Sequence, residues 1–454
     1  MSFPRYRQYK DSGVEWLGEV PEHWEVGPLR RSIEFLTDYE ANGSFADTKE
    51  NVAIDTGEPY AWYVRATDLE QRRFGLVEGN RFCDQATFNW LTKTSLRGGE
   101  LLVAKRGEIG KVYVMPTYGG NATLAPNLYL IRLKQNLQPR YAWYWFSVDP
   151  GKAELVLADK STTIGALYKD DVKSCFVATP STAEQTRIVE FLDRETGKID
   201  ELVAEQQRLM ELLKEKRQAV ISHAVTKGLN PRAPMKPSGI EWLGDVPAHW
   251  AVGAIKHFTE TITDGAHVSP ETEDGIYPFV STKDVLAESI DLEGCLRTSA
   301  SSYQYMVKTG CKPKVADVLF SKDGTIGRTV VVTKPDDFVV ASSLIIVRPN
   351  RDILSSKFLN RLCQSGLVTA QVDSFVKGAG LPRLSIQNLL KVVGCFPPPA
   401  EQACIAEYVD REVGKIDALS AEAHKAIDLL QERRTALISA AVTGQIDVRK
   451  LAVA

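Results

Sequence analysis

The chain consists of two copies of one pattern in the same order, and this duplication restricts its fold more than any single motif. Residues 12–24 return as residues 238–250 with the shared pattern W-L-G-x-V-P-x-H-W, and residues 183–226 return as residues 400–443. The stretches between these matched segments have similar lengths but agree only sparsely. A frame that is retained while its contents differ indicates one scaffold that carries two different binding surfaces.

Charge and composition argue against several classes of protein. A net charge of −3 over 454 residues does not suit a chain that binds polyanions over its whole surface. The repeated segments 183–226 and 400–443 are acidic, so the remaining residues carry a small positive excess, as expected if only the lobes meet phosphate. The seven cysteines and six histidines are scattered without a C-x-x-C pair, which predicts reduced thiols and no bound metal. We expect a cytoplasmic protein, because no window approaches the roughly 20 apolar residues of a membrane span.

The repeated segment 183–226 has the pattern of a long helix. It follows Pro180, and Ser181 and Glu184 have the spacing of a capping box. Its apolar residues fall at steps of three, four or seven, as in a coiled-coil seam. These are Leu192, Ile199, Leu202, Leu209, Leu213 and Val220 in the first copy and Val409, Ile416, Leu419, Ala426, Leu430 and Leu437 in the second.

Identity between the two helical copies extends to polar positions that a seam alone does not require. More than half of the aligned positions are identical. We therefore expect these polar faces to dock a partner, with the same contacts made twice. The expected docking residues are Glu184, Gln185, Arg194, Lys198, Asp200, Glu401, Gln402, Arg411, Lys415 and Asp417. The helix ends differ, Lys227-Gly228 against Gly444-Gln445, which predicts two unequal docking sites.

Connectivity predicts how the two helices pair. The short linker 229–237 places the second lobe near the end of the first helix, so the second helix must run back to pair along its length of about 65 Å. The predicted fold class is therefore α+β, with two globular α/β-mixed lobes separated by two long antiparallel coiled-coil helices in a pseudo-twofold internal repeat. The predicted segments are lobe 1–180, helix 181–228, linker 229–237, lobe 238–397 and helix 398–454.

Three matched loops in the lobes hold the candidate DNA-binding residues. Residues 105–111 align with residues 322–328, with two glycines for a tight turn and a cation at each end. A nucleotide phosphate loop does not fit, because its spacing is wrong and no Ser or Thr follows the Lys. A plain hairpin turn with solvated charges and a basic loop that grips phosphate or a guanine edge remain open.

The other two loops pair residues 160–167 with residues 377–384 and residues 64–68 with residues 280–284. The first pair is rich in small polar residues, which suits either an ordinary loop or contacts to phosphate and base. Asp68 and Asp284 either cap a following turn or accept from a cytosine amine. The candidate DNA-binding residues are Arg65, Thr67, Lys105, Arg106, Lys111, Lys160, Ser161, Thr162, Thr163, Thr282, Lys283, Lys322, Arg328, Lys377 and Arg383. Charge reversal at Lys105 and Lys111 is expected to weaken DNA binding broadly.

The repeated tryptophans favour a core clasp over base stacking. Trp16 and Trp24 return as Trp242 and Trp250 with Leu and Val between them, a spacing more typical of packing than of exposed platforms. The sequence contains no G-x-G-x-x-G after a strand and no convincing Ser/His/Asp grouping. We expect a chain that binds and has no catalytic residues.

The order of variable lobe and polar helix, given twice, resembles the specificity subunit of type I restriction-modification systems. The resemblance lies in Glu184-Gln185 with residues 221–226, in Glu401-Gln402 with residues 438–443, and in the W-L-G-x-V-P-x-H-W openings. It implies two target-recognition domains that each read half of a bipartite site in double-stranded DNA. It also implies that the helices set the gap between the half-sites and dock two methyltransferase subunits, joined by restriction subunits in the full complex. S-adenosylmethionine and ATP would bind those partners, and this chain would hold no cofactor.

Two other functions remain open at this point. A DNA-independent tandem scaffold that joins two protein partners would show no salt-dependent binding to duplex DNA. An enzyme with a site hidden in one lobe would turn over without added subunits. Within the favoured interpretation, neither the target bases nor the presence of restriction can be read from the residues.

Overall fold

The computed structural model describes residues 3–107, 109–149, 151–157, 166–271, 275–376 and 382–451. It divides into two compact units, Met1–Glu205 with Ala426–Ala454 and Gln206–Lys425. The division points lie inside the two long helices α7 (Thr182–Lys227) and α12 (Pro399–Val442). Each unit therefore contains one lobe and a segment of each helix, and each is described by itself.

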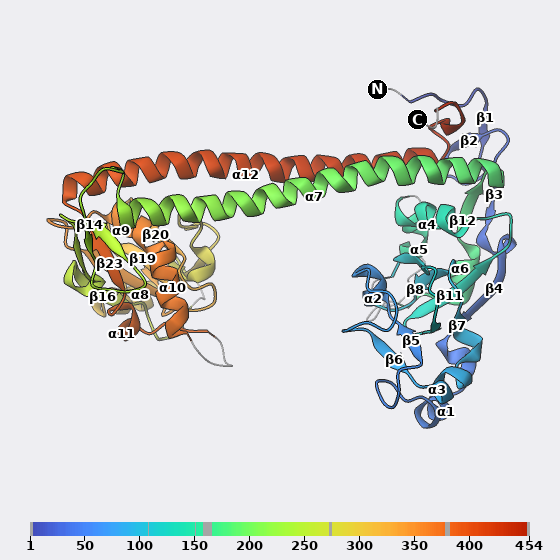
Figure 1. The fold of residues 1–454 in the computed structure, drawn as a ribbon, viewed down its shortest axis with the longest axis horizontal. Helices are drawn as coiled ribbons and strands as arrows, with labels where there is room; N and C mark the ends of the chain where they lie inside the picture. Colours follow the sequence, from blue (N-terminus) through green and yellow to red (C-terminus); the bar gives the residue numbers. More distant parts are fainter. Residues whose placement is uncertain are drawn as a thin grey trace. The chain divides into compact units, whose positions relative to one another are not determined.

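The lobe of the first unit contains two four-stranded sheets (Figure 1). The first is antiparallel and has the order β4 (Ile33–Asp38), β11 (Leu128–Leu133), β8 (Leu101–Ala104), β9 (Val112–Val114). The second has the order β6 (Arg81–Cys83), β5 (Ala61–Val64), β10 (Asn121–Leu124), β7 (Ser95–Leu96), with β5 and β10 parallel. The helices are α1 (Phe45–Asn51), α2 (Ala66–Glu70), α3 (Gln85–Trp90), α4 (Pro139–Ser147), α5 (Gly151–Leu157) and α6 (Lys169–Ser174), with 3-10 turns at Leu29–Arg31, Tyr39–Asn42 and Thr92–Thr94.

The second unit repeats this arrangement. Its antiparallel sheet has the order β16 (Thr259–Asp264), β22 (Leu344–Pro349), β19 (Val318–Ser321), β20 (Thr329–Val331). Its second sheet has the order β18 (Leu296–Thr298), β17 (Tyr277–Val280), β21 (Val339–Val340), with β17 and β21 parallel. The helices are α8 (Ala300–Lys308), α9 (Ser356–Cys363), α10 (Gly366–Phe375) and α11 (Ile386–Leu389), with 3-10 turns at Ile255–His257 and Thr282–Asp284.

The repeated opening segment forms the same frame in each unit. In the first unit β1 (Tyr9–Asp11) pairs with β2 (Glu19–Pro21), and β3 (Glu25–Pro28) pairs with β12 (Phe176–Thr179) just before α7 begins. In the second unit β13 (Met235–Pro237) pairs with β14 (Asp245–Pro247), and β15 (Ala251–Ala254) pairs with β23 (Val393–Phe396) just before α12. The end of the expected linker 229–237 is thus a strand, because its backbone completes the hairpin of the second opening.

Within each unit the two helix segments run antiparallel. In the first, Asp200 of α7 pairs with Arg434 of α12, and Glu184 lies near Arg449. In the second, Arg217 pairs with Asp417, at the matching positions of the repeat. Leu192 and Ile199 are buried in the main core of the first unit together with Leu437.

The predicted seam is only partly buried. Leu202, Leu209 and Leu419 are exposed, and Leu212 and Leu429 beside them are exposed as well. Each of these leucines lies on a helix that packs against one other helix. A single partner helix covers only part of an apolar stripe, so the rest of the stripe stays exposed. The expectation that all of them pack in the seam is therefore wrong for these three positions.

The second helix ends earlier than expected, and each long helix is followed by a glycine with positive φ. The second helix stops at Val442 and does not run to residue 454; a 3-10 turn follows at Val448–Lys450. Gly444 adopts φ +77 and packs against Pro21 and Trp24, and Gly228 adopts φ +73 against Trp250. A left-handed glycine is a common way to end a helix, since other residues adopt that conformation with strain. A glycine with positive φ thus follows each helix, directly after Lys227 at the end of α7 and after Thr443 just beyond the end of α12. The expectation of two unequal docking sites stays a prediction.

Candidate nucleic-acid interface

The opening segments are held to the helix starts by one glutamate in each unit. Glu184, only 5 % exposed, accepts a hydrogen bond from the Tyr6 hydroxyl at 2.7 Å and from Trp24 Nε1 at 3.3 Å. His23 Nε2 lies 2.9 Å from its other oxygen. Burial and the bond to Glu184 raise the pKa of Tyr6 well above its usual value.

Glu401 makes the matching contacts in the second unit. Its carboxylate lies 2.7 Å from His249 Nε2 and accepts from Trp250 Nε1 at 3.1 Å, with 30 % of the side chain exposed. Trp24 and Trp250 are buried, which confirms the clasp interpretation for them. Trp16 and Trp242 are 43 % and 58 % exposed, so the clasp interpretation is wrong for that pair.

The glutamines next to these glutamates are buried and bind backbone of their own lobes. Gln185 accepts from the Gln138 amide at 2.8 Å and donates to carbonyls of Asn136 and Pro180. Gln402 repeats this with the Ser355 amide and carbonyls of Ile353 and Pro397. The expectation that Glu184, Gln185 and Gln402 dock a partner is corrected, because buried atoms that already hold the lobe cannot reach another protein.

The other expected docking residues lie on the exposed sides of the helices. Arg194 and Lys198 flank Glu195, and Arg411 and Lys415 flank Glu412, so both helices carry the same charged triplet. Asp200 and Asp417 are engaged in the ion pairs between helices. The triplets remain available to a partner, whereas the aspartates stabilise the helix pair.

Two of the expected DNA-binding lysines are buried in ion pairs. Lys105 Nζ lies 2.8 Å from Asp38 and 3.2 Å from Glu40, and Lys322 Nζ lies 2.5 Å from Asp264. Burial would raise the pKa of Asp38, but hydrogen bonds from Lys105 and Lys169 outweigh it and lower the pKa below its usual value. The prediction that Lys105 and Lys322 contact DNA is therefore wrong. Each is a structural cation, because it neutralises a carboxylate at the end of a strand in the antiparallel sheet of its own lobe.

We expect Lys105→Met to destabilise the first unit by about 2 kcal/mol, because it removes one partner of a buried ion pair and leaves Lys169 beside Asp38. Hydrogen exchange of the β11 amides measures this loss locally. Since the folded pKa of Asp38 is depressed, the stabilisation is present above the unfolded value near 4 and shrinks as the pH falls below it. Lys111→Met is the control, because its exposed pair with Glu70 should contribute no more than about 0.5 kcal/mol. Equal exchange in the two variants would contradict the structural role.

The loops that carry the remaining cations are tight glycine turns, as predicted. Gly107 and Gly110 between β8 and β9 have φ +82 and +85, and Gly324 and Gly327 between β19 and β20 have φ +70 and +89. Arg106 is 59 % exposed beside the first turn. The exposed Arg328 donates to the Val285 carbonyl at 3.4 Å, and Arg383 pairs with Asp323 at 3.0 Å.

A cleft of about 610 Å³ in the first lobe brings three of the predicted residues together. Arg65, Thr67 and Arg106 line it with Arg81 and Asn127, which were not predicted. Arg81 lies on β6, directly opposite Tyr63 of β5, so the strand pairing places it beside the predicted loop. The only sequence signal for Arg81 is that an arginine lies in a strand-like run after a turn. The strand with which that run pairs cannot be read from a single sequence.

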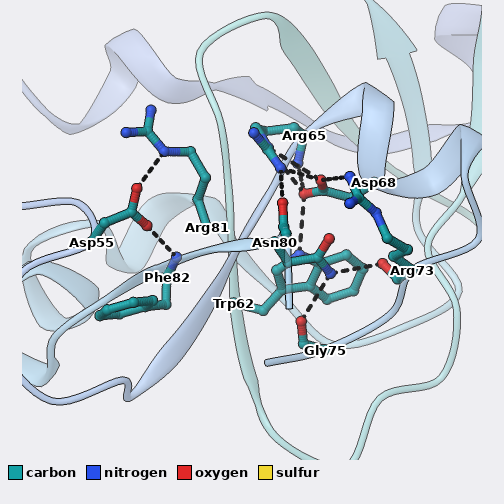
Figure 2. A network of polar contacts seen from close by, with 10 residues as sticks. Asp55, Trp62, Arg65, Asp68, Arg73, Gly75, Asn80, Arg81 and Phe82 are labelled. Atoms are coloured by element: carbon teal, nitrogen blue, oxygen red, sulfur yellow. Dashed lines mark hydrogen bonds and ion pairs between the residues drawn. The ribbon is translucent and has the colours of Figure 1, made fainter. Parts of the chain in front are cut away.

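A polar network holds Arg65, one of the residues that line this cleft (Figure 2). Arg65 Nη2 donates to Asp68 at 2.6 Å and to the Gly79 carbonyl at 2.8 Å. Asp68 is buried, caps α2 through the Arg65 amide and accepts from Trp62 Nε1. Asp68 and its counterpart Asp284 therefore cap turns, which decides between the two alternatives left open above.

The remaining predicted residues are placed as follows. Thr282 bonds to Ser343 through its amide and hydroxyl, and Lys283 beside it is exposed. Lys160, Ser161, Thr162, Thr163 and Lys377 lie outside the described residues. Within the described ranges, no three His, Cys, Asp or Glu side chains gather as metal ligands, and no helix has the length and apolarity to cross a membrane.

Comparison with known proteins finds one family. The type I restriction modification DNA specificity domain matches residues 63–211 and 247–427. The chain is 22 % identical over 312 residues to the EcoBI specificity subunit of Escherichia coli, covering 67 % of this chain and 65 % of that subunit. It is 22 % identical over 448 residues to the putative MjaX specificity subunit of Methanocaldococcus jannaschii, covering 95 % and 96 %.

Solved structures show the same fold. A chain from a type I R-M system, solved to explain complex assembly and conformational transition, superposes with a TM-score of 0.67 at 16 % identity, over 94 % of this chain and 99 % of that one. The HsdS subunit of Thermoanaerobacter tengcongensis gives 0.50 at 16 % identity, over 94 % and 98 %.

Proposed function

The chain belongs to the family of type I restriction modification DNA specificity domains, and from this premise we propose that it reads a bipartite site in double-stranded DNA without catalytic residues of its own. Each lobe would read one half-site. The observation that carries this proposal is the repetition of one lobe topology with different side chains at matching positions. A shared frame with changed surface residues suits two readers of different sequence.

The two long helices would bind the partner subunits. We propose that two methyltransferase subunits dock on the repeated charged triplets around Glu195 and Glu412, together with exposed leucines such as Leu209 and Leu419. An apolar stripe rimmed by charge is typical of a protein interface. Restriction subunits would join in the full complex. S-adenosylmethionine and ATP would bind to those partners, and the protein would act in the cytoplasm.

A transplant within the chain tests the reading function. Replacing residues 33–174 by residues 259–391 puts a second copy of the second lobe between β3 and β12. These boundaries keep each strand of the β16 sheet with its partners and keep the buried pair of Asp264 with Lys322 together. We expect the two half-sites of the bound DNA to become identical, measured by selection from a randomised duplex library.

The reverse transplant is the matched control, since it should give a site with two copies of the first half. A transplant that changes both halves to new sequences, or neither half, would contradict the modular proposal. A DNA-independent scaffold predicts that the parent chain selects no duplex at all and that binding shows no salt dependence.

A further inference from the structure

We propose that Arg106 reads a guanine in the half-site of the first lobe, an inference that rests on the DNA-reading function proposed above. The residue lines the cleft of about 610 Å³ and is 59 % exposed. A guanidinium can donate two hydrogen bonds to O6 and N7 of guanine in the major groove, which is the commonest specific contact between a side chain and a base.

The three arginines of the cleft differ in how strongly their charge is already neutralised. Arg65 donates to Asp68 at 2.6 Å, and Arg81 donates to Asp55 at 2.6 Å (Figure 2). Arg106 Nη2 lies 3.8 Å from Glu40, beyond hydrogen-bond distance. Glu40 also lies 3.2 Å from Lys105, so its charge is shared between two cations. Among the arginines that line this cleft, Arg106 has the donors that are least committed within the protein.

The backbone holds Arg106 in a fixed place. Its neighbour Lys105 is buried, and the Lys105 amide donates to the carbonyl of Asn127, another lining residue, at 2.9 Å. On its other side, Gly107 begins the tight turn to β9. Arg106 itself forms a backbone bridge with Ala166. A planar donor group on a rigid support is suited to base recognition, because little ordering is left to do on binding.

The second unit has the opposite charge at the matching position. Lys105 corresponds to Lys322, and both are buried in ion pairs, so this position has the same structural role twice. The next residue changes from Arg106 to Asp323, which forms the same backbone bridge, here with Arg383, and pairs with that arginine at 3.0 Å. The charge at this position therefore changes sign between the lobes, whereas the lysine before it is retained.

This reversal favours a base contact over a phosphate contact. Phosphates lie along both half-sites in the same pattern and carry no sequence information, so a residue that grips phosphate should be a cation in both lobes. A carboxylate already paired with an arginine, as Asp323 is with Arg383, offers phosphate no net positive charge. Bases differ between half-sites, and a residue that reads them is expected to differ as well.

The test compares Arg106→Gln in the full chain with the parent by selection from randomised duplexes, followed by titration of the parent site. We expect one guanine of the first half-site to lose its preference, and affinity for the parent site to fall roughly tenfold or more. Arg106→Lys should lose much of the same preference, because an ammonium lacks the paired donors. Lys49→Gln is the control: it removes one exposed charge on α1 and should leave every preference unchanged.

The second half-site serves as an internal measure of folding, since its preference should stay unchanged in Arg106→Gln. Equal weakening on all sequences with no change in preference would identify a phosphate contact and overturn the inference. Unchanged affinity and preference would overturn it as well. If the parent chain selects no duplex, the proposed function itself fails, and that result is seen before any variant is made.

Discussion

Glu184→Ala is expected to destabilise the first unit by about 4 kcal/mol. The substitution removes the acceptor of the Tyr6 hydroxyl and of Trp24 Nε1, both buried, and leaves them without a partner. Each buried donor left unsatisfied costs about 1–3 kcal/mol. His23 and Arg449, at 2.9 and 3.9 Å, lose their nearby anion too. Hydrogen exchange of the β2 amides and of the first turns of α7 measures the loss.

Glu401→Ala provides the matched control in the same molecule. Glu401 contacts His249 and Trp250 as Glu184 contacts their counterparts, but it is 30 % exposed. Water can replace part of what it provides, so a loss of about 1 kcal/mol is expected in the second unit. Two losses of equal size would show that burial does not set the strength of these contacts. Glu184→Gln should fall between the two, since it keeps an acceptor oxygen and loses the charge.

Local patterns in the sequence were enough to predict the long helices and the turns. The spacing of Ser181 and Glu184 and the apolar steps behind them predict a helix where α7 lies. Gly107 and Gly110 predict a tight turn because few other residues adopt positive φ, and the structure has that turn. These features depend on residues close together in the chain. The antiparallel course of the helix segments followed from the shortness of the linker.

Contacts between distant residues were not predictable in this way. The sequence predicts a DNA contact at Lys105 because its partner Asp38 is 67 residues away, at the end of a strand whose pairing no local pattern reveals. The repetition of this lysine as Lys322 indicates a shared role, and in both lobes that role is a buried ion pair. Repetition shows that a residue has the same role twice, and it does not say whether the role is internal or external.

The same ambiguity affected the helices. Gln185 and Gln402 are identical in the two copies because both bind the backbone before α4 and α9, and a docked partner would demand the same identity. Burial decides between the two roles, and burial depends on the lobe that folds over the helix start. Leu209 shows the converse, since its heptad position predicts packing while a pair of helices leaves it exposed.

Insertion of four residues into each long helix should change the spacer of the DNA site and leave both half-sites unchanged. Insertion after Arg208 and after Lys425 keeps the ion pairs of Asp200 with Arg434 and of Arg217 with Asp417 intact, because each pair lies wholly on one side of the inserted residues. A four-residue insertion is a stutter that coiled-coil seams accommodate by local unwinding. If helix length sets the gap, an added 6 Å or so should favour a spacer about two base pairs longer.

Affinity for the original site should then fall by about a thousandfold, toward non-specific binding, and a site with the longer spacer should recover most of it. Selection from libraries that combine both half-sites with variable spacers measures the preference directly. Four residues inserted after Gly119, in a loop of the first lobe, are the control for the effect of added length and should leave the spacer unchanged. If the chain with both insertions still prefers the original spacer, helix length does not set the separation of the half-sites. In that case each lobe would have to find its half-site through the shape of the DNA or through the partner subunits, since the two half-sites carry no information about their separation.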